Sequence, residues 1–315
     1  MEAVAIVMYE TFYGLQERPF DLSPNPRFLC FTPQHREALA HLEYGLAGRP
    51  GVTVLVGEAG TGKTTLVRKA LQASSSASRI VHLSNPTLTR AEFFEYLAAG
   101  FAFSADAGFS KIQFLRELEA ALNDPAGPRL ALIVDEAQSV PYELLEEIRL
   151  LTNAESSIGR SIAVVLVGQP ELGRRLDEAR LRQLKQRVVL RCELTPLSLK
   201  DTAAYISGRV KTAGGEAVRL FSRDAVIAIH QHSNGIPRVI SVVCDNALVN
   251  GFAADQKPVG AATVMEVCRS LSLPAAQRDT VPAAPAMVAA SEPVAAATRA
   301  PMFNSVAGRR RFSFF

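Results

Sequence analysis

The sequence predicts an α/β fold in which a parallel five-stranded sheet carries helices on both faces, followed by a small all-helical lid domain. The first observation is that residues 51–195 alternate short, β-branched apolar runs with helical stretches. The second is that residues 196–271 keep a helical spacing but contain no strand-like run. Repeated strand–helix–strand units build parallel sheets with right-handed crossovers, so we expect the five strands to run parallel.

Strands are predicted where hydrophobicity is nearly continuous, a pattern typical of strands covered on both faces. The five runs are Val52–Val56, Ile80–Leu83, Leu130–Val134, Ile162–Val167 and Val188–Leu194. Amphipathic helices are predicted between them, at Phe109–Leu122 and after Pro141, where proline suits a first turn. Apolar residues recur there at helical spacing: Phe114, Leu115, Leu118 and Leu122, then Leu144, Leu145, Ile148 and Leu151.

The chain is predicted to have four segments. Residues 1–50 lead into the core, residues 51–195 form the α/β domain, residues 196–271 form the lid domain and residues 272–315 form a tail. The predicted lid helices are Leu197–Thr212, Arg223–His232, Pro237–Phe252 and Ala261–Ser270.

The tail is expected to be disordered, because it is rich in Ala, Pro, Val and Ser, and proline at that density breaks both helix and strand. Its end, Arg309 to Phe315, combines three arginines with three phenylalanines. Such a terminus could contact an acidic membrane surface or dock on a partner, or it could have no role.

Composition describes an ordinary globular chain, with 48% hydrophobic and 21% charged residues among 315. No apolar stretch approaches the roughly 18 residues that a membrane span needs, and the start lacks a basic region typical of a secretory signal. We therefore expect a cytoplasmic protein. The net charge of +3 lies entirely after Leu271, so a neutral body disfavours a broad nucleic-acid surface.

A glycine-rich loop lies between the first predicted strand and a helical run. It matches Gly-x-x-x-x-Gly-Lys-Thr in full, and its residues are Gly57, Glu58, Ala59, Gly60, Thr61, Gly62, Lys63 and Thr64, followed by Thr65. Glycines let backbone N–H groups curl around phosphate oxygens, and the helix N-terminus adds positive potential. Lys63 is expected to reach the β- and γ-phosphates, and the Thr64 hydroxyl to bind Mg2+.

Two carboxylates follow the third predicted strand, at Asp135 and Glu136. Asp135 is expected to hold magnesium through water, and Glu136 to orient and deprotonate the attacking water. Acidic strand ends are common, but together with a matched phosphate loop this pair indicates an ATPase rather than a nucleotide switch without a base.

Beyond these motifs the chain resembles AAA+ ATPases, and more narrowly the ExeA/general secretion pathway protein A family. The resemblance covers residues 8–270. The phrases that carry it are Met8-Tyr9-Glu10-Thr11-Phe12-Tyr13-Gly14-Leu15, Ser23-Pro24-Asn25-Pro26-Arg27-Phe28, Asp135-Glu136-Ala137-Gln138, Val167-Gly168-Gln169-Pro170, Leu184-Lys185-Gln186-Arg187 and Gly235-Ile236-Pro237-Arg238. It implies a P-loop NTPase (AAA+) fold, and it suggests Met8 rather than Met1 as the natural start.

The resemblance also implies roles for residues outside the two motifs. Gln169 stands at the sensor 1 position, where it would feel the γ-phosphate or the attacking water, although a polar turn residue is the alternative. Arg187, with Arg182 as a competitor, would be an arginine finger completing a neighbour's site, or part of a solvated basic face. Arg238 would be sensor 2, and region Phe28–Leu46, including His35, would wall the adenine side.

The expected function is Mg2+-dependent ATP hydrolysis by a homo-oligomer. Members of the family are linked to envelope secretion, pilus and polysaccharide export systems, so we expect a partner of that kind and a cytoplasmic location that could include peripheral contact with the inner membrane. Longer members carry a transmembrane segment and a peptidoglycan-binding part, so only the ATPase function is carried over. The alternatives are a DNA-transaction ATPase, as in transposition, and a nucleotide-dependent scaffold with slow turnover.

Overall fold

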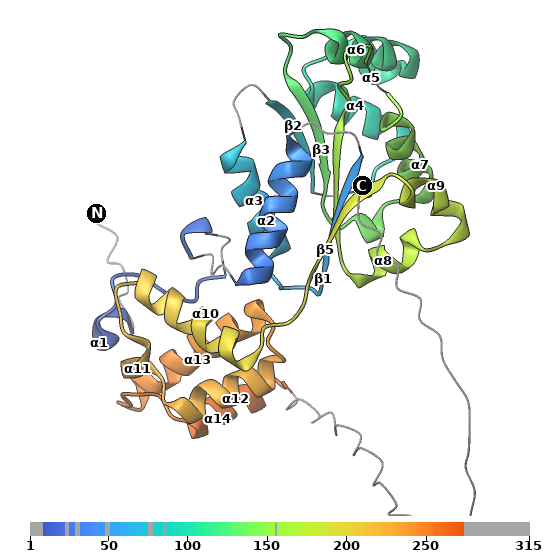
Figure 1. Cartoon of the computed structure of the whole chain (residues 1–315). Coiled ribbons are helices and arrows are strands. Elements are labelled where there is room, and N and C mark those ends of the chain that lie inside the picture. Colours follow the sequence, from blue (N-terminus) through green and yellow to red (C-terminus); the bar gives the residue numbers. More distant parts are fainter. Residues whose placement is uncertain are drawn as a thin grey trace, which may run out of the picture. The chain divides into compact units, whose positions relative to one another are not determined.

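In the computed structural model, five parallel strands form one sheet in the order β2-β3-β4-β1-β5 (Figure 1). Their bounds are β1 Val52–Gly57, β2 Ser78–Leu83, β3 Arg129–Val134, β4 Ala163–Gly168 and β5 Val188–Leu194. The predicted α/β fold is therefore confirmed, and the strand positions agree with the predicted runs within two residues.

The structure describes residues 9–22, 25–28, 32–47, 51–74, 78–84, 86–154 and 156–273. These residues belong to one compact unit of the chain. The predicted tail covers residues 272–315, and from residue 274 on it lies outside the described residues, including its basic-aromatic end at Arg309 to Phe315. The choice between Met1 and Met8 lies outside them too.

The two faces of the sheet bury different side chains, as the alternation of a strand requires. In β1, Val52, Val54 and Val56 face one hydrophobic cluster, whereas Leu55 faces another. The second cluster is built with helices α2 (Pro33–Leu46) and α3 (Lys63–Ala73). The first cluster is built with helices on the opposite face, α4 (Arg90–Gly100), α6 (Lys111–Asn123), α7 (Tyr142–Leu151), α8 (Pro170–Leu176) and α9 (Arg182–Lys185) (Figure 1).

Burial differs between central and edge strands. β1 and β4 are buried throughout, and β3 from its second residue. In contrast, β2 and β5 alternate buried with partly or fully exposed residues. The prediction that all five strands are covered on both faces is therefore wrong for β2 and β5, because they are the two edges of the sheet and have one neighbour each.

The predicted helix Phe109–Leu122 is confirmed as α6, whose bounds agree with the prediction within two residues, and a short separate helix precedes it. Helix α5 (Ala105–Phe109) ends at Phe109, whose side chain is 81% exposed, and the Ser110 hydroxyl then caps α6 by accepting from the Gln113 N–H. Serine at this position satisfies a free backbone donor and starts a new helix. Phe114, Leu118 and Leu122 are buried as predicted.

Helices α10 (Leu199–Thr212), α11 (Ala217–Leu220), α12 (Arg223–Ser233), α13 (Pro237–Ala253) and α14 (Ala261–Ser270) follow the sheet. They share a third hydrophobic cluster with the beginning of the chain, through Tyr9, Tyr13, Leu15, Phe20 and Phe28. The segment before α2, which includes α1 (Glu10–Tyr13) and the turn η1 (Pro26–Phe28), thus packs with the helical part. Within the described ranges, no helix combines the length and the apolar character needed to cross a membrane.

Candidate nucleotide-binding site

The site lies where three neighbouring strands end. β1 pairs with β4, and β4 pairs with β3, with Val56 opposite Gly168 and Val134 opposite Leu166. Because all three strands run the same way, the loops that follow them meet at one edge of the sheet. This is the edge at which open α/β sheets bind their ligands.

The glycine-rich loop connects β1 to α3. Gly60 and Gly62 have φ angles of 84° and 100°, a left-handed conformation that glycine adopts without steric cost. Gly62 precedes the first residue of α3, so the unpaired N–H groups of the first helical turn open into the loop. These features suit an anion, as the sequence predicted for a phosphate.

Lys63 points back into its own loop. Its Nζ donates to the carbonyls of Gly57 at 2.8 Å and Glu58 at 3.0 Å. Burial lowers the pKa of Lys63, and the nearby carboxylates of Glu136 and Asp135 act against that shift by favouring the charged form. The ammonium is thus held in place at the end of β1.

The two carboxylates face this loop. The Thr64 hydroxyl donates to Oδ2 of Asp135 at 3.0 Å, and Oδ1 of Asp135 accepts from the Glu136 N–H at 3.0 Å. Asp135 is only 5% exposed, and its own N–H donates to the carbonyl of Leu83 in β2. Thr64 and Asp135, the two predicted metal-binding residues, are therefore adjacent.

Glu136 has a φ of 51°, unusual for a residue with a side chain. Its Oε2 accepts from Nε2 of Gln138 at 2.5 Å and from Nε2 of Gln169 at 3.3 Å. Gln169 thus contacts the acid that the sequence singled out as base. Gln138 belongs to the turn η2 (Ala137–Ser139), and sequence reasoning assigned it no role.

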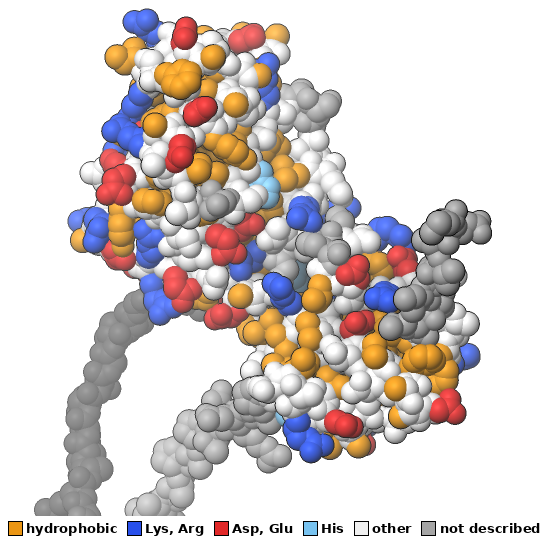
Figure 2. Space-filling view, turned by 180° about the vertical axis from the view of Figure 1, so that it is seen from behind, with side chains coloured by type: hydrophobic (Ala, Val, Ile, Leu, Met, Phe, Trp, Pro, Cys, Tyr) orange, Lys and Arg blue, Asp and Glu red, His pale blue; other side chains and the backbone are white. Residues whose placement is uncertain are grey.

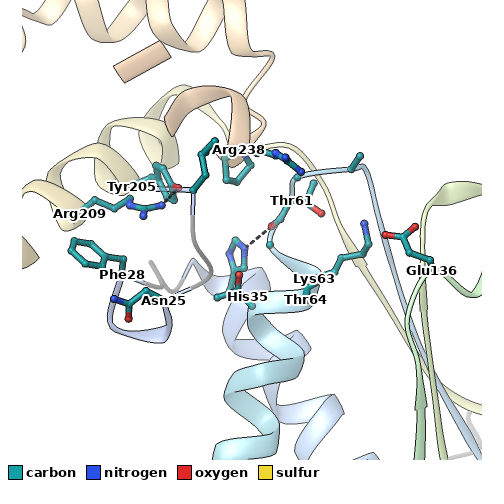
Figure 3. A pocket seen from close by; sticks show the side chains of 16 residues that line it. Asn25, Phe28, His35, Thr61, Lys63, Thr64, Glu136, Tyr205, Arg209 and Arg238 are labelled. Atoms are coloured by element: carbon teal, nitrogen blue, oxygen red, sulfur yellow. Dashed lines mark hydrogen bonds between the residues drawn. The ribbon is translucent and has the colours of Figure 1, made fainter. Parts of the chain in front are cut away.

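A cavity of about 460 Å³ opens beside the loop (Figure 3). The loop residues from Ala59 to Thr65 and Glu136 line it, and Figure 3 shows the Glu136 carboxylate turned toward Lys63. Further lining residues come from the beginning of the chain and from the helical part: Asn25, Phe28, His35, Tyr205, Arg209 and Arg238. Phe28 and His35 fall within the predicted adenine wall, whereas Leu42 packs in the core instead.

Asn25, Tyr205 and Arg209 were not assigned roles by sequence reasoning. Arg209 is 9% exposed and donates to the carbonyls of Pro19 at 2.6 Å and Asp21 at 3.0 Å, and to the Tyr205 hydroxyl at 2.6 Å. A buried guanidinium fixes the start of the chain beside the cavity. No local pattern could reveal this, because the partners are about 190 positions apart.

His35 joins α2 to the glycine-rich loop. One ring nitrogen contacts the Thr32 hydroxyl at 2.6 Å, and the other contacts the Thr61 carbonyl at 3.3 Å. Burial lowers the pKa of His35, so the neutral ring is favoured.

Arg238 is the second residue of α13, and its backbone N–H donates to the Gly60 carbonyl at 3.1 Å. Its side chain lies beside the loop (Figure 3). Arg187 is elsewhere: its guanidinium is exposed, donates to Oδ1 of Asn153 at 2.6 Å and does not line the cavity. Arg182 is also exposed and outside the lining. The structure therefore gathers all the predicted site residues except the arginine finger candidates.

These residues fit a magnesium nucleotide. The left-handed glycines suit a loop whose backbone N–H groups turn toward phosphate oxygens, the Lys63 cation lies within that loop, and a hydroxyl and a carboxylate stand 3.0 Å apart as hard oxygen ligands. The parallel sheet, the loop and the acidic strand end together define a P-loop protein of the AAA type.

Sequence comparison agrees with this class. Residues 47–176 match the family model described as AAA domain. The chain is 42% identical over 248 residues to General secretion pathway protein A from Aeromonas hydrophila, a match that covers 78% of this chain and 45% of that protein. The resemblance seen in the sequence is confirmed: the chain carries an AAA domain and is a homologue of General secretion pathway protein A, of which it spans less than half.

Solved structures of the same fold share little sequence. Cdc6p from Pyrobaculum aerophilum gives a TM-score of 0.59 at 17% identity over 80% of this chain and 70% of that chain. The ORC2 protein of Aeropyrum pernix, in ADPNP–ADP complexes, gives a TM-score of 0.60 at 18% identity, over 81% of this chain and 71% of that chain. Drosophila ORC bound to DNA gives a TM-score of 0.57 at 20% identity, over 81% of this chain and 65% of that chain. These likenesses concern the fold alone.

Proposed function

We propose that this chain is a Mg2+-dependent ATPase that converts ATP and water to ADP and phosphate. The observation that carries the proposal is the placement of Lys63 and Thr64 opposite Asp135 and Glu136, with Thr64 Oγ1 3.0 Å from Asp135 Oδ2. A loop that binds phosphates, a metal ligand pair and an acid beside them are what phosphoryl transfer to water requires.

The glycine-rich loop and the metal ligands bind and orient the nucleotide. The backbone N–H groups from Gly57 to Thr65 and the Lys63 ammonium hold the phosphates, and Arg238 extends the cationic rim. Thr64 would bind Mg2+ directly and Asp135 would hold it through water, and the bound metal would neutralise charge on the phosphate oxygens. His35 and Phe28 also line the cavity, and their rings suit contact with the adenine of the nucleotide.

Glu136 is the proposed general base. In an attack by water, its carboxylate takes the proton while Gln169 orients the groups around it, in keeping with the 3.3 Å contact between them. Arg187 does not line the cavity, which fits a role in the site of a neighbouring subunit, where its cation would stabilise transition-state charge.

Replacing Glu136 by glutamine tests this assignment. The side chain keeps its size but cannot accept the proton, so we expect turnover to fall by about 10² to 10⁴ while Mg-ATP binding persists. Glu119→Gln is the matched control, since Glu119 is an exposed carboxylate on α6. Equal steady-state rates for wild type and Glu136→Gln would exclude Glu136 as the base.

We further infer that the ATPase works as a homo-oligomer for an envelope secretion or polysaccharide export system, from the cytoplasmic side of the inner membrane. Homology to General secretion pathway protein A supports the secretion link. On the face shown in Figure 2, Lys and Arg are interspersed with Asp and Glu, which favours a protein partner over a nucleic acid. Co-purification with Glu136→Gln in the presence of ATP tests the link: an envelope-system protein is expected, and nucleic acid alone would contradict it.

A further inference from the structure

Gln138 bridges the ends of two strands. Its Nε2 donates to Oε2 of Glu136 at 2.5 Å, and its Oε1 accepts from the Gln169 N–H at 3.0 Å. Glu136 follows β3, and Gln169 follows β4, so one side chain links the proposed base to the backbone of the neighbouring strand end.

The partners fix which way the amide points. A backbone N–H needs an acceptor and a carboxylate needs a donor, so only the orientation with Nε2 toward Glu136 satisfies both. In the reverse orientation, two acceptors would meet at Glu136 and two donors would meet at Gln169. The direction of the amide is thus set by chemistry.

The seat of Gln138 is built by further residues. Arg175 donates from one guanidinium nitrogen to the Gln138 carbonyl and from another to the Val140 carbonyl at 2.9 Å. The Arg175 guanidinium also lies 4.4 Å from the ring centroid of Tyr142. A Cβ at Gly168 would come within 2.8 Å of Gln138 Oε1, so the absence of a side chain there leaves room for the amide.

One oxygen of the Glu136 carboxylate remains available. Both amide donors, from Gln138 and Gln169, go to Oε2, and no hydrogen bond from the part of the chain that the structure describes reaches Oε1. Two donors on one oxygen restrict the rotation of the carboxylate and present the other oxygen in a defined direction.

We propose that Gln138 is a positioning residue for ATP hydrolysis, which holds Oε2 of Glu136 so that Oε1 accepts the proton of the attacking water. The inference rests on the proposed function, since it needs Glu136 to be the base. Gln138 acts through Glu136: it does not line the cavity, and the hydrogen bonds that Thr64 and Asp135 make in the described residues do not include it. Its loss therefore acts on the chemical step and not on nucleotide binding.

Three variants test this role by steady-state kinetics with Mg-ATP. Gln138→Leu removes both hydrogen bonds at similar volume. Gln138→Glu keeps the shape but replaces the donor by a carboxylate facing Glu136. Gly168→Ala keeps the other side chains of the site but crowds the Gln138 seat, and Gly168 has no positive φ, so alanine introduces no backbone strain there. The added Cβ would also come within 2.9 Å of the buried Leu172, so this variant is interpreted only if its melting temperature is kept.

We expect all three variants to lower kcat by between about 10-fold and 100-fold, with KM for ATP unchanged within about twofold, because positioning a general base affects the transition state alone. The melting temperature is expected to stay within a few degrees of wild type. Gln231→Leu is the control, because Gln231 is an exposed glutamine on α12 far from the cavity lining.

Three results would overturn the proposal. A Gln138→Glu variant as fast as wild type would mean that Gln138 only fills space. A Gln138→Leu variant with unchanged or raised kcat would mean that it does not position the base. Parallel losses of ATP affinity and melting temperature would indicate a structural role. Failure of the ATPase itself is recognised separately, because wild type and Glu136→Gln would then show equal rates.

Discussion

At the scale of single residues, the site balances buried charges against one another. Lys63 is 6% exposed, and its ammonium donates to two carbonyls of its own loop. A buried cation is tolerated only with such partners. Phosphate oxygens would compete for the same ammonium, so Lys63 would exchange these carbonyls for an anionic partner on binding.

His35 should make stability depend on pH. Burial lowers its pKa, so near pH 6.5 the unfolded chain binds more protons than the folded one. The free energy of unfolding is therefore highest above the unfolded pKa of about 6.5 and falls as the pH drops toward the lower folded pKa. We expect the melting temperature of His35→Gln to fall less steeply than that of wild type between about pH 7 and pH 5.

The readout is the difference in slope, because a general loss of packing in His35→Gln would lower its melting temperature by a similar amount at every pH. His82 and His230 also have pKa values lowered by burial, so wild type should keep part of its slope without His35. Parallel melting curves for the two proteins would show that His35 does not contribute.

At the scale of elements, the turn between α12 and α13 is sterically demanding. Gly235 has a φ of 70°, and a Cβ there would come within 2.1 Å of the Leu197 carbonyl oxygen. Since the obstacle is backbone, Gly235→Ala should lower the free energy of unfolding by at least about 3 kcal/mol. Urea denaturation measures this effect.

Gly260→Ala is the matched control for that prediction. Gly260 lies in the same helical part, has a φ of −94°, and nothing lies within 4 Å of its added Cβ. Gly260 is the N-cap of α14, so its substitution should cost no more than about 1 kcal/mol, the usual effect of alanine at an N-cap. Equal losses of unfolding free energy for the two substitutions would show that the contact with Leu197 does not determine the stability of this turn.

Much of the site could be predicted from sequence, because its signals are local. The glycine-rich loop and Asp135-Glu136 each occupy a few consecutive residues next to an apolar strand. The role of Gln138 could not be predicted, since it depends on the order β3-β4, which places Gln169 beside it. The same holds for Arg209, whose partners are distant in sequence.

The partial exposure of the edge strands could not be predicted from the sequence pattern either. β2 and β5 are apolar enough to suggest central strands, and only the sheet order exposes one side of each. The predicted start of α6 is two residues too early, although Ser110 is a local signal for a helix cap.

At the scale of the whole molecule, the proposed role of Arg187 in a neighbouring subunit's site can be tested by mixing variants. If it completes a neighbour's site, Arg187→Ala should lose turnover but keep Mg-ATP binding. A mixture with Glu136→Gln should regain activity, because a site with Glu136 from one subunit and Arg187 from the other is intact. Steady-state rates of each variant alone and of the mixture measure this complementation.

The same experiment with Arg182→Ala distinguishes the two candidates. Restoration with only one of the two arginine variants identifies the residue that acts between subunits. A mixture no faster than the sum of its components, for both arginines, would contradict a shared site.

The most direct test of the central claim is a calorimetric titration of Mg-ATP into wild type and Lys63→Ala. The account predicts one nucleotide bound per wild-type chain and at least about tenfold weaker binding by the variant, because a charged hydrogen-bond partner of the phosphates is removed. No heat of binding for wild type, or the same affinity for both proteins, would contradict it.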